Sequence, residues 1–391
     1  MNYNYEDRVL RICPEGRIDA AGTNELTEQM KRLLDAHPAE RVELDLERVV
    51  YISSAGLRVI LRLRQAVPNT ALVNVSSEVY EILDVTGFTE IMEVRRAYRT
   101  VSVEGCEIVG CGVNGRVYRL SQDTVVKVYQ NPQALEEMQR ERELARTAFV
   151  LGVPTVIPYD VVKIQGGGYG SVYELLNATN FAKLLIRGER TLDEVARMSV
   201  ELLKIIHGTT VNPDTTPSAR EQALSWAEDL KRVLPAAQYE ALRGLIAAVP
   251  EDNRLLHGDY HIRNVTRQGE ENLILDLDTL CHGHPIFELG SMYNAYRGFS
   301  ELEPGAVERY LGIDLETAHA FWRRTLERYL DTEDDQRIRE VEDKAAVLGF
   351  TRLLRRRIRR GGFDSEEGRA EIERCQALLA ERLSRVESLV F

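Results

Sequence analysis

The sequence has little of what a secreted scaffold or a membrane protein needs. Its five cysteines are scattered over 391 residues without a CxxC pair, so neither a disulfide framework nor a common zinc spacing is indicated. No segment reaches the roughly 18 apolar residues of a membrane span, and the first residues lack the basic start and apolar stretch of a signal peptide. We therefore predict a cytoplasmic protein with reduced thiols and no membrane partner.

The charge balance also excludes a class of partner. Lys and Arg number 50 against 62 Asp and Glu, which gives a net charge of −12. Because such a charge opposes broad attraction to polyanions, we expect no nucleic-acid partner. Small molecules or proteins are the expected partners, and the length and the 44% hydrophobic content suit two or three folded domains.

The first part of the chain alternates short β-like runs with amphipathic helical runs. The expected strands are VLRIC, RVELDL and ALVNV, and the expected helices are NELTEQMKRLLDAH, AGLRVILRLRQA and SEVYEILDVTG. This alternation predicts an α/β domain over residues 1–99.

A different pattern begins near residue 101. A glycine-rich turn lies between β-like runs, a charged helix is expected over about 132–150, and the runs DVVKI and SVYELL follow. From about residue 177 helical patterns dominate. A second domain over 101–391 is therefore predicted, and its boundary rests on this change of pattern alone.

The glycine-rich turn fits GxGxxG through Gly110, Gly112 and Gly115. A dinucleotide site would need a helix directly after the glycines, whereas RVYRL and TVVKVY predict a β-hairpin. This favours a kinase-like loop in which backbone amides approach phosphate oxygens and Lys127 reaches the α and β phosphates. The alternative is an ordinary glycine turn followed by an exposed lysine.

A lysine in that role needs a carboxylate to hold it. The helix after the hairpin offers several glutamates, of which Glu141 shares a face with Met138, Ala145 and Ala148. We therefore expect Glu141 to point inward and pair with Lys127.

The segment HGDYHIRNV, residues 257–265, precedes the apolar run LILDLD. Asp259 can accept the proton of an attacking hydroxyl, and Asn264 and Asp276 can hold Mg²⁺ at the nucleotide phosphates. On an extended strand Asp278 would face the same side as Asp276, where it either assists the metal or forms an ion pair.

Together these residues resemble the aminoglycoside phosphotransferase and choline kinase group within the protein-kinase-like fold. The resemblance implies an α+β bilobal domain, with an N-lobe over about 101–176 and a helical C-lobe over about 177–391. It also implies ATP, Mg²⁺ and transfer of the γ-phosphoryl group to a hydroxyl of a small molecule or protein. By the same resemblance the segment from Tyr173 to Leu176, which includes Glu174, is the hinge whose backbone meets the adenine. Ile262 departs from the proline of many members, and DLD replaces DFG, with no APE motif after it.

The segment VYISSAGLRVIL near residue 50 has two serines before a helical run, so Ser53 or Ser54 can cap that helix. In its α/β context the segment also resembles the phosphorylatable loop of STAS domains, the anti-sigma factor antagonist fold. The resemblance makes Ser54 a phosphorylation site and an anti-sigma-factor-like kinase or another signalling protein a partner. Ser53 stands where the family usually has aspartate.

Two charged runs near the C-terminus have ordinary explanations. We interpret the arginines of TRLLRRRIRR and the acidic run over 331–343 as solvated helix faces. The chain as a whole is predicted to be an ATP-dependent phosphotransferase with a STAS regulatory module. The alternative is a pseudokinase, a non-catalytic signalling scaffold, but Lys127, Asp259, Asn264 and Asp276 are all present and favour an enzyme.

Overall fold

The computed structural model describes residues 1–111, 115–131 and 135–391. These residues form two compact units, Met1–Gly105 with Val161–Gly170, and Cys106–Asp160 with Ser171–Phe391. The segment 161–170 belongs to the first unit because strand β8 (Thr100–Val101) pairs in parallel with β12 (Asp160–Ile164).

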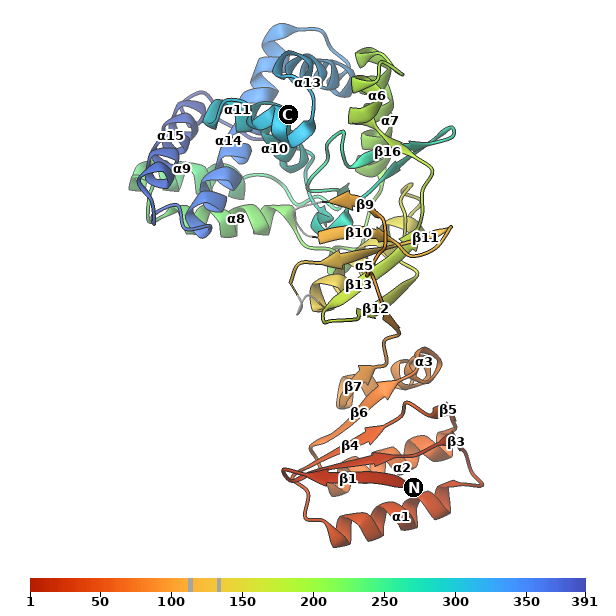
Figure 1. Ribbon diagram of the computed structural model, residues 1–391. Helices are drawn as coiled ribbons and strands as arrows, with labels where there is room; N and C mark the ends of the chain where they lie inside the picture. Colours follow the sequence, from red (N-terminus) through yellow and green to blue (C-terminus); the bar gives the residue numbers. More distant parts are fainter. Residues whose placement is uncertain (112–114, 132–134) are drawn as a thin grey trace. The chain divides into compact units, whose positions relative to one another are not determined.

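The first unit contains a five-stranded sheet of order β1-β2-β4-β6-β7, in which β1 is antiparallel to β2 and the other pairs are parallel (Figure 1). Its strands are β1 Asn2–Glu6, β2 Val9–Cys13, β3 Gly16–Ile18, β4 Arg41–Asp45, β5 Val49–Ile52, β6 Thr70–Val75 and β7 Glu93–Arg96. Its helices are α1 Thr23–Ala36, α2 Ser54–Ala66, α3 Ser77–Val85 and α4 Phe88–Ile91. The predicted strands and helices are all present, and the α/β class is confirmed.

Apolar alternation builds the core of this unit. Leu10 and Ile12, two residues apart in β2, are fully buried, as is Leu44 in β4. Strand β1 was not predicted because its residues are mostly exposed, so no apolar alternation marks it.

The second unit begins with strands of a six-stranded sheet of order β8-β12-β13-β11-β10-β9. Its elements here are β9 Ile108–Cys111, β10 Gly115–Arg119, β11 Thr124–Tyr129, α5 Leu135–Val150 and β13 Tyr169–Glu174. Strands β10 and β11 are antiparallel, with Val117 opposite Lys127. The chain after the glycines is therefore the predicted hairpin and not the helix of a dinucleotide site.

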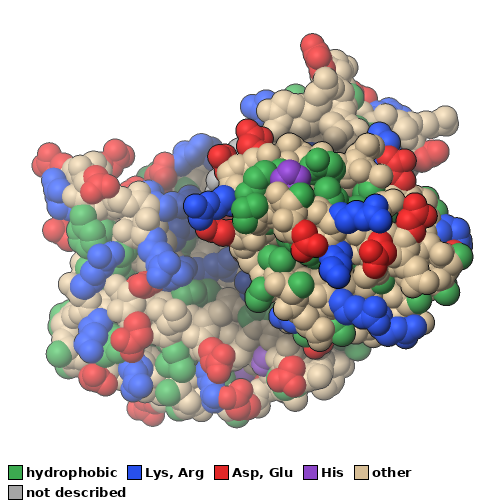
Figure 2. Space-filling view, turned by 90° about the horizontal axis from the view of Figure 1, so that it is seen from below, with side chains coloured by type: hydrophobic (Ala, Val, Ile, Leu, Met, Phe, Trp, Pro, Cys, Tyr) green, Lys and Arg blue, Asp and Glu red, His purple; other side chains and the backbone are tan. Residues whose placement is uncertain are grey.

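The rest of the second unit is mainly helical. Its helices are α6 Phe181–Ile186, α7 Leu192–Gly208, α8 Ala219–Leu230, α9 Ala236–Ala247, α10 Ile286–Tyr293, α11 Phe299–Leu302, α12 Ala306–Leu311, α13 Leu315–Leu330, α14 Asp335–Arg359 and α15 Glu366–Leu383. Short strands are β14 Thr179–Asn180, β15 Leu255–Leu256, β16 Val265–Gln268, β17 Glu271–Ile274 and β18 Cys281–His282. No helix in the described ranges is long and apolar enough to cross a membrane. Lys and Arg side chains are interspersed with Asp and Glu over the face in Figure 2.

Helices α10 and α14 approach each other closely at two glycines. A Cβ added at Gly290 would lie 2.7 Å from the Cβ of Leu348, and one at Gly349 would lie 2.6 Å from Oδ1 of Asn294. Because real Cβ atoms do not come so close, both positions require glycine at this separation of the helices. The close approach brings Ser291 of α10 within hydrogen-bond distance of Arg352 of α14.

We predict that Gly290→Ala lowers the free energy of unfolding by about 1–3 kcal/mol because the added methyl overpacks this contact. The matched control is Gly244→Ala in α9, where an added Cβ meets nothing within 4 Å. There alanine should be neutral or stabilise by up to about 1 kcal/mol. Chemical denaturation of both variants of the full chain measures the difference, and equal stabilities would contradict the packing argument.

Candidate active site

Lys127 of β11 bridges two carboxylates that are distant in sequence. Its Nζ lies 2.9 Å from Oε1 of Glu141 in α5 and 2.8 Å from Oδ1 of Asp276. Burial by itself would lower the pKa of Lys127, but the two carboxylates outweigh it and raise the pKa. The lysine is therefore charged, and the ion pair predicted with Glu141 is present.

Two tyrosines also hold Glu141, a role that the sequence did not predict for either of them. The Tyr173 hydroxyl donates a hydrogen bond to its Oε1 at 3.1 Å, and the Tyr129 hydroxyl donates to Oε2. The Glu141 side chain retains 6% of its exposure, so these donors replace the water that a buried carboxylate has lost. Tyr129 lies two residues after Lys127 on β11, and this period-2 spacing is the sequence signal for it.

Asp276 adopts a left-handed backbone conformation, with φ 63° and ψ 68°. Such a conformation is uncommon for a residue with a side chain, and it recurs at functional sites. A 3₁₀ turn, Leu277–Thr279, follows directly, so the expectation that Asp278 continues an extended strand is wrong. Burial and the nearby Asp276 carboxylate raise the pKa of Asp278.

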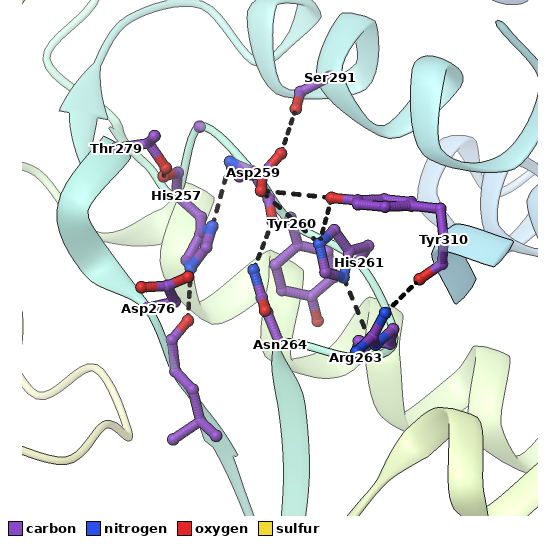
Figure 3. A network of polar contacts seen from close by, with 12 residues as sticks. His257, Asp259, Tyr260, His261, Arg263, Asn264, Asp276, Thr279, Ser291 and Tyr310 are labelled. Carbon is purple, nitrogen blue, oxygen red and sulfur yellow. Dashed lines mark hydrogen bonds and ion pairs between the residues drawn. The ribbon is translucent and has the colours of Figure 1, made fainter. Parts of the chain in front are cut away.

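Asp259 lies in the loop of HGDYHIRNV among four polar groups (Figure 3). The hydroxyls of Ser291 and Tyr310 donate to its two oxygens at 3.4 and 3.5 Å, His261 Nε2 is 3.6 Å away, and Arg352 Nη2 is 3.8 Å away. Burial favours the neutral acid, but the nearby His261 imidazole and the Arg352 charge outweigh it and lower the pKa of Asp259. Its side chain retains 35% exposure, so an ionised carboxylate remains accessible.

Asn264 connects this loop to the strand that leads to Asp276. Its Nδ2 donates to the main-chain oxygen of Asp259 at 3.1 Å, and its own main-chain oxygen accepts from the Leu275 N–H at 2.8 Å. None of the described residues donates a hydrogen bond to its side-chain oxygen. Figure 3 shows the contact between Asp259 and Asn264, with Asp276 in the same view.

Glu288 of α10 holds the main chain of this loop, a role that the sequence analysis did not predict. This fully buried carboxylate accepts hydrogen bonds from the main-chain N–H groups of His257, Gly258 and Tyr260. Burial opposes its ionisation, but the imidazoles of His207, 3.9 Å away, and His257, together with the Gly258 N–H, lower its pKa. The sequence signal was an acidic residue inside the apolar run IFELGSMY.

Two further loop positions have clear backbone requirements. Gly258 has φ +81°, and an added Cβ would meet the main-chain oxygen of Thr279 at 2.3 Å. The Ile262 N–H donates to the Tyr296 hydroxyl at 3.0 Å. Since proline has no N–H, this bond gives a physical reason for the departure at Ile262.

Arg352 contradicts the interpretation of the arginine run as a solvated face. Its Nη1 donates to the main-chain oxygen of Gly258 and to Oγ of Ser291, both at 2.7 Å. One arginine of α14 is therefore hydrogen-bonded to Gly258, the residue directly before Asp259.

The other predicted nucleotide residues lie in the hairpin and after β13. Gly110 lies in β9, Gly112 lies outside the described residues, and Gly115 begins β10. An added Cβ at Gly115 would meet the main-chain oxygen of Val128 at 2.2 Å, so this glycine has a packing requirement of its own. Glu174 is exposed at the end of β13, and Leu176 follows it half-buried. Their contact with a nucleotide stays a prediction.

Comparison with known families assigns both parts of the chain. A model of the Phosphotransferase enzyme family, APH, matches residues 106–325. The chain belongs to this phosphotransferase family. A STAS domain model matches residues 2–103. A protein of Bordetella bronchiseptica named as an anti-sigma factor antagonist, BtrV, is 36% identical over 92 residues, which cover 22% of this chain and 78% of that protein.

Several solved structures are similar to this chain at low identity. A choline/ethanolamine kinase family protein from Mesorhizobium loti is 17% identical, with a TM-score of 0.47, covering 71% of this chain and 91% of the other. ADP-bound APH(2'')-Ib is 13% identical, with a TM-score of 0.49, covering 81% and 99%. A thermostable APH(4)-Ia with AMP-PNP and hygromycin B is 16% identical, with a TM-score of 0.48, covering 71% and 94%.

The STAS domain places its two serines differently. Ser53 is the N-cap of α2, since its Oγ accepts from the Gly56 N–H at 3.4 Å, and its hydroxyl also donates to the Ile18 main-chain oxygen at 3.3 Å. Ser54 is the first residue of the helix and is exposed. Ser53 therefore fulfils the capping role, and Ser54 is accessible.

We predict that Glu288→Gln lowers the free energy of unfolding of the chain by about 2–3 kcal/mol. In the wild type both carboxylate oxygens accept hydrogen bonds from main-chain N–H groups. In the variant the amide NH₂ replaces one of these oxygens, so a donor faces a donor and one main-chain N–H loses its acceptor. The control is Glu240→Gln on the exposed face of α9, which should stay within about 0.5 kcal/mol of the wild type. Urea denaturation followed by far-UV circular dichroism measures both. A loss below about 0.5 kcal/mol at Glu288 would show that the loop does not depend on this carboxylate.

Proposed function

We propose that the chain is an ATP- and Mg²⁺-dependent phosphotransferase that moves the γ-phosphoryl group to an acceptor hydroxyl. The observation that carries the proposal is the bridge from Lys127 to Glu141 and Asp276. It is supported by the ionised, accessible Asp259 in the same unit and by membership of the phosphotransferase family. Phosphoryl transfer asks a protein for positioning and charge stabilisation, and these groups provide both.

The nucleotide side of the site is built around Lys127. In the proposed complex its ammonium contacts the α and β phosphate oxygens, while Glu141, held by Tyr129 and Tyr173, fixes the position of that ammonium. The glycines Gly110, Gly112 and Gly115 would bring backbone N–H groups to the phosphates, and the segment from Glu174 to Leu176 would meet the adenine.

The donor set at the phosphates fits Mg²⁺. The side-chain oxygen of Asn264 accepts no hydrogen bond from the residues that the structure describes, and the half-exposed Asp276 uses only Oδ1 toward Lys127. A carboxylate and an amide oxygen are hard ligands that suit this ion, which keeps waters and substrate phosphates in its other positions. When bound, Mg²⁺ would neutralise charge on the transferring phosphoryl group.

Asp259 handles the acceptor. Its lowered pKa keeps the carboxylate ionised, so it orients the acceptor by accepting a hydrogen bond from its O–H and takes the proton as the bond forms. The acceptor oxygen then bonds to the γ-phosphorus as the bond to the β–γ bridging oxygen breaks. ADP leaves with that electron pair, and the acceptor proton ends on Asp259.

We predict that Asp259→Asn lowers the rate of phosphoryl transfer by at least about 100-fold, because the amide cannot take the acceptor proton. Mg-ATP affinity should stay within about threefold, since Asp259 contacts the acceptor and not the nucleotide. The matched variant, Asp276→Asn, should instead weaken Mg-ATP binding by at least about tenfold through loss of a metal ligand. Labelled-ATP transfer assays and calorimetry measure the two effects.

The two variants separate the proposal from its alternative. Full transfer activity in Asp259→Asn would refute the assignment of the base, and unchanged Mg-ATP affinity in Asp276→Asn would refute the metal site. A wild-type protein that binds Mg-ATP but transfers phosphate to no acceptor would instead indicate the non-catalytic scaffold.

We propose, as a second function, that the STAS domain binds a signalling protein under the control of a phosphate on Ser54. The exposed Ser54 hydroxyl at the start of α2 supports this, because main-chain N–H groups at a helix N-terminus stabilise a phosphate. The phosphate would add roughly two negative charges to the partner surface and so change its affinity. An anti-sigma-factor-like serine kinase is the proposed partner, by likeness to BtrV.

We expect mass spectrometry to find phosphate on Ser54 and none on Ser53 after incubation with Mg-ATP and such a kinase, because the Ser53 hydroxyl is engaged as the N-cap. Ser54→Ala is the control and should remain unmodified. Incubation with Mg-ATP alone tests the attached domain: Ser54 phosphate in the wild type but not in Asp259→Asn would assign the modification to it. Phosphate on Ser53 in place of Ser54 would overturn the assignment.

A further inference from the structure

The arginines near the end of α14 divide into paired and unpaired groups. Arg355 and Arg359 bond to Asp229, and Arg357 bonds to Glu371. Arg356 and Arg360 are exposed and form no ion pair with any residue that the structure describes. Two positive charges therefore remain without a carboxylate at this end of the helix.

One of the unpaired arginines continues the face of α14 that reaches Asp259. Arg356 follows Arg352 by four residues, so these two side chains share one helix face, and Arg360 is the C-cap residue directly after the helix. Arg352 itself lies 3.8 Å from the Asp259 carboxylate. A row of cationic side chains thus leads away from the proposed base.

Arg263, a residue of the loop itself, adds a further positive charge. Its Nη1 donates to the main-chain oxygen of Tyr310, whose hydroxyl lies 3.5 Å from Asp259 and 2.7 Å from His261 (Figure 3). Arg263 forms no ion pair within the described ranges. These charges all act on the Tyr310 hydroxyl. Burial and the Asp259 carboxylate raise the pKa of Tyr310, and the positive charges of Arg352, Arg356 and Arg263 oppose that rise.

The acidic run over 331–343 lies at the opposite end of α14 from these arginines. Five of its seven carboxylates are used within the helical part: Asp334 caps α14, Asp335 bonds to Arg323, Glu340 to Lys344, Glu342 to Arg297 and Asp343 to Arg382. A cationic acceptor would therefore be repelled by the arginines next to Asp259, and the paired carboxylates of the acidic run would not attract it.

Resting on the proposed function, we propose that the acceptor is a small hydroxyl compound that already carries a phosphate or carboxylate group. Its hydroxyl faces Asp259, and its anionic group lies along α14 against Arg356 and Arg360, one to two helical turns from Arg352. Guanidinium groups bind phosphate and carboxylate through paired N–H donors, so both anions fit this surface. In the transfer step the acceptor hydroxyl oxygen bonds to the γ-phosphorus, ADP leaves with the electron pair of the broken bond, and Asp259 takes the hydroxyl proton. The anionic group of the acceptor takes no part in bond making.

The test uses the full chain saturated with Mg-AMP-PNP, so that anions cannot enter the nucleotide site. The probes are glycerol 3-phosphate, glycerate, glycerol and a polycationic aminoglycoside, with binding measured by calorimetry. We expect the two anionic probes to bind at least about tenfold more tightly than glycerol. Arg356→Gln with Arg360→Gln should weaken that binding by about tenfold, whereas the control Arg359→Gln, on the same helix, should leave it unchanged.

Each outcome decides the proposal. Tighter binding of the aminoglycoside, equal binding of anionic and neutral probes, or an equal loss in Arg359→Gln would overturn it. Transfer from labelled ATP to acidic protein segments, without binding of the small anions, would also overturn the small-molecule class. Failure of AMP-PNP itself to bind would refute the proposed function, whereas transfer to cationic acceptors would refute only this inference.

Discussion

The candidate active site depends on one buried carboxylate. Glu288 takes three main-chain N–H groups of the loop that presents Asp259, and so it fixes the loop in a conformation that also requires glycine at 258. A buried charge is costly unless it is fully hydrogen-bonded, and this one is satisfied by the loop itself. The loop and helix α10 therefore stabilise each other.

The same constraint extends to α14 through Arg352. The Arg352 side chain donates hydrogen bonds to the Gly258 main-chain oxygen and to Ser291, and it lies 3.8 Å from Asp259. Two helices therefore hold the loop, α10 through Glu288 and α14 through Arg352. The glycine contact between these helices makes that arrangement possible. Packing of two helices thus sets the charge beside the proposed base.

The two family domains carry complementary chemistry in one chain. The STAS domain presents an exposed serine at a helix start, and the domain of the phosphotransferase family holds the groups proposed for phosphoryl transfer. A covalent link can raise the local concentration of one domain around the other to roughly millimolar. The proposed modification of one domain by the other would therefore need no strong affinity between them.

The sequence by itself determined the local features of this protein. The α/β alternation, the hairpin after the glycines, the inward face of Glu141 and the order of the motif residues all follow from periodicity and short-range chemistry, and the structure has each of them. Only the tertiary structure decided that Glu288 and Arg352 hold the loop, because their partners lie about 30 and 94 residues earlier in the chain. It also decided that Asp276 turns left-handed and ends the strand that Asp278 was expected to continue. Helix periodicity places an arginine on a face, but what that face meets is set by packing between distant segments.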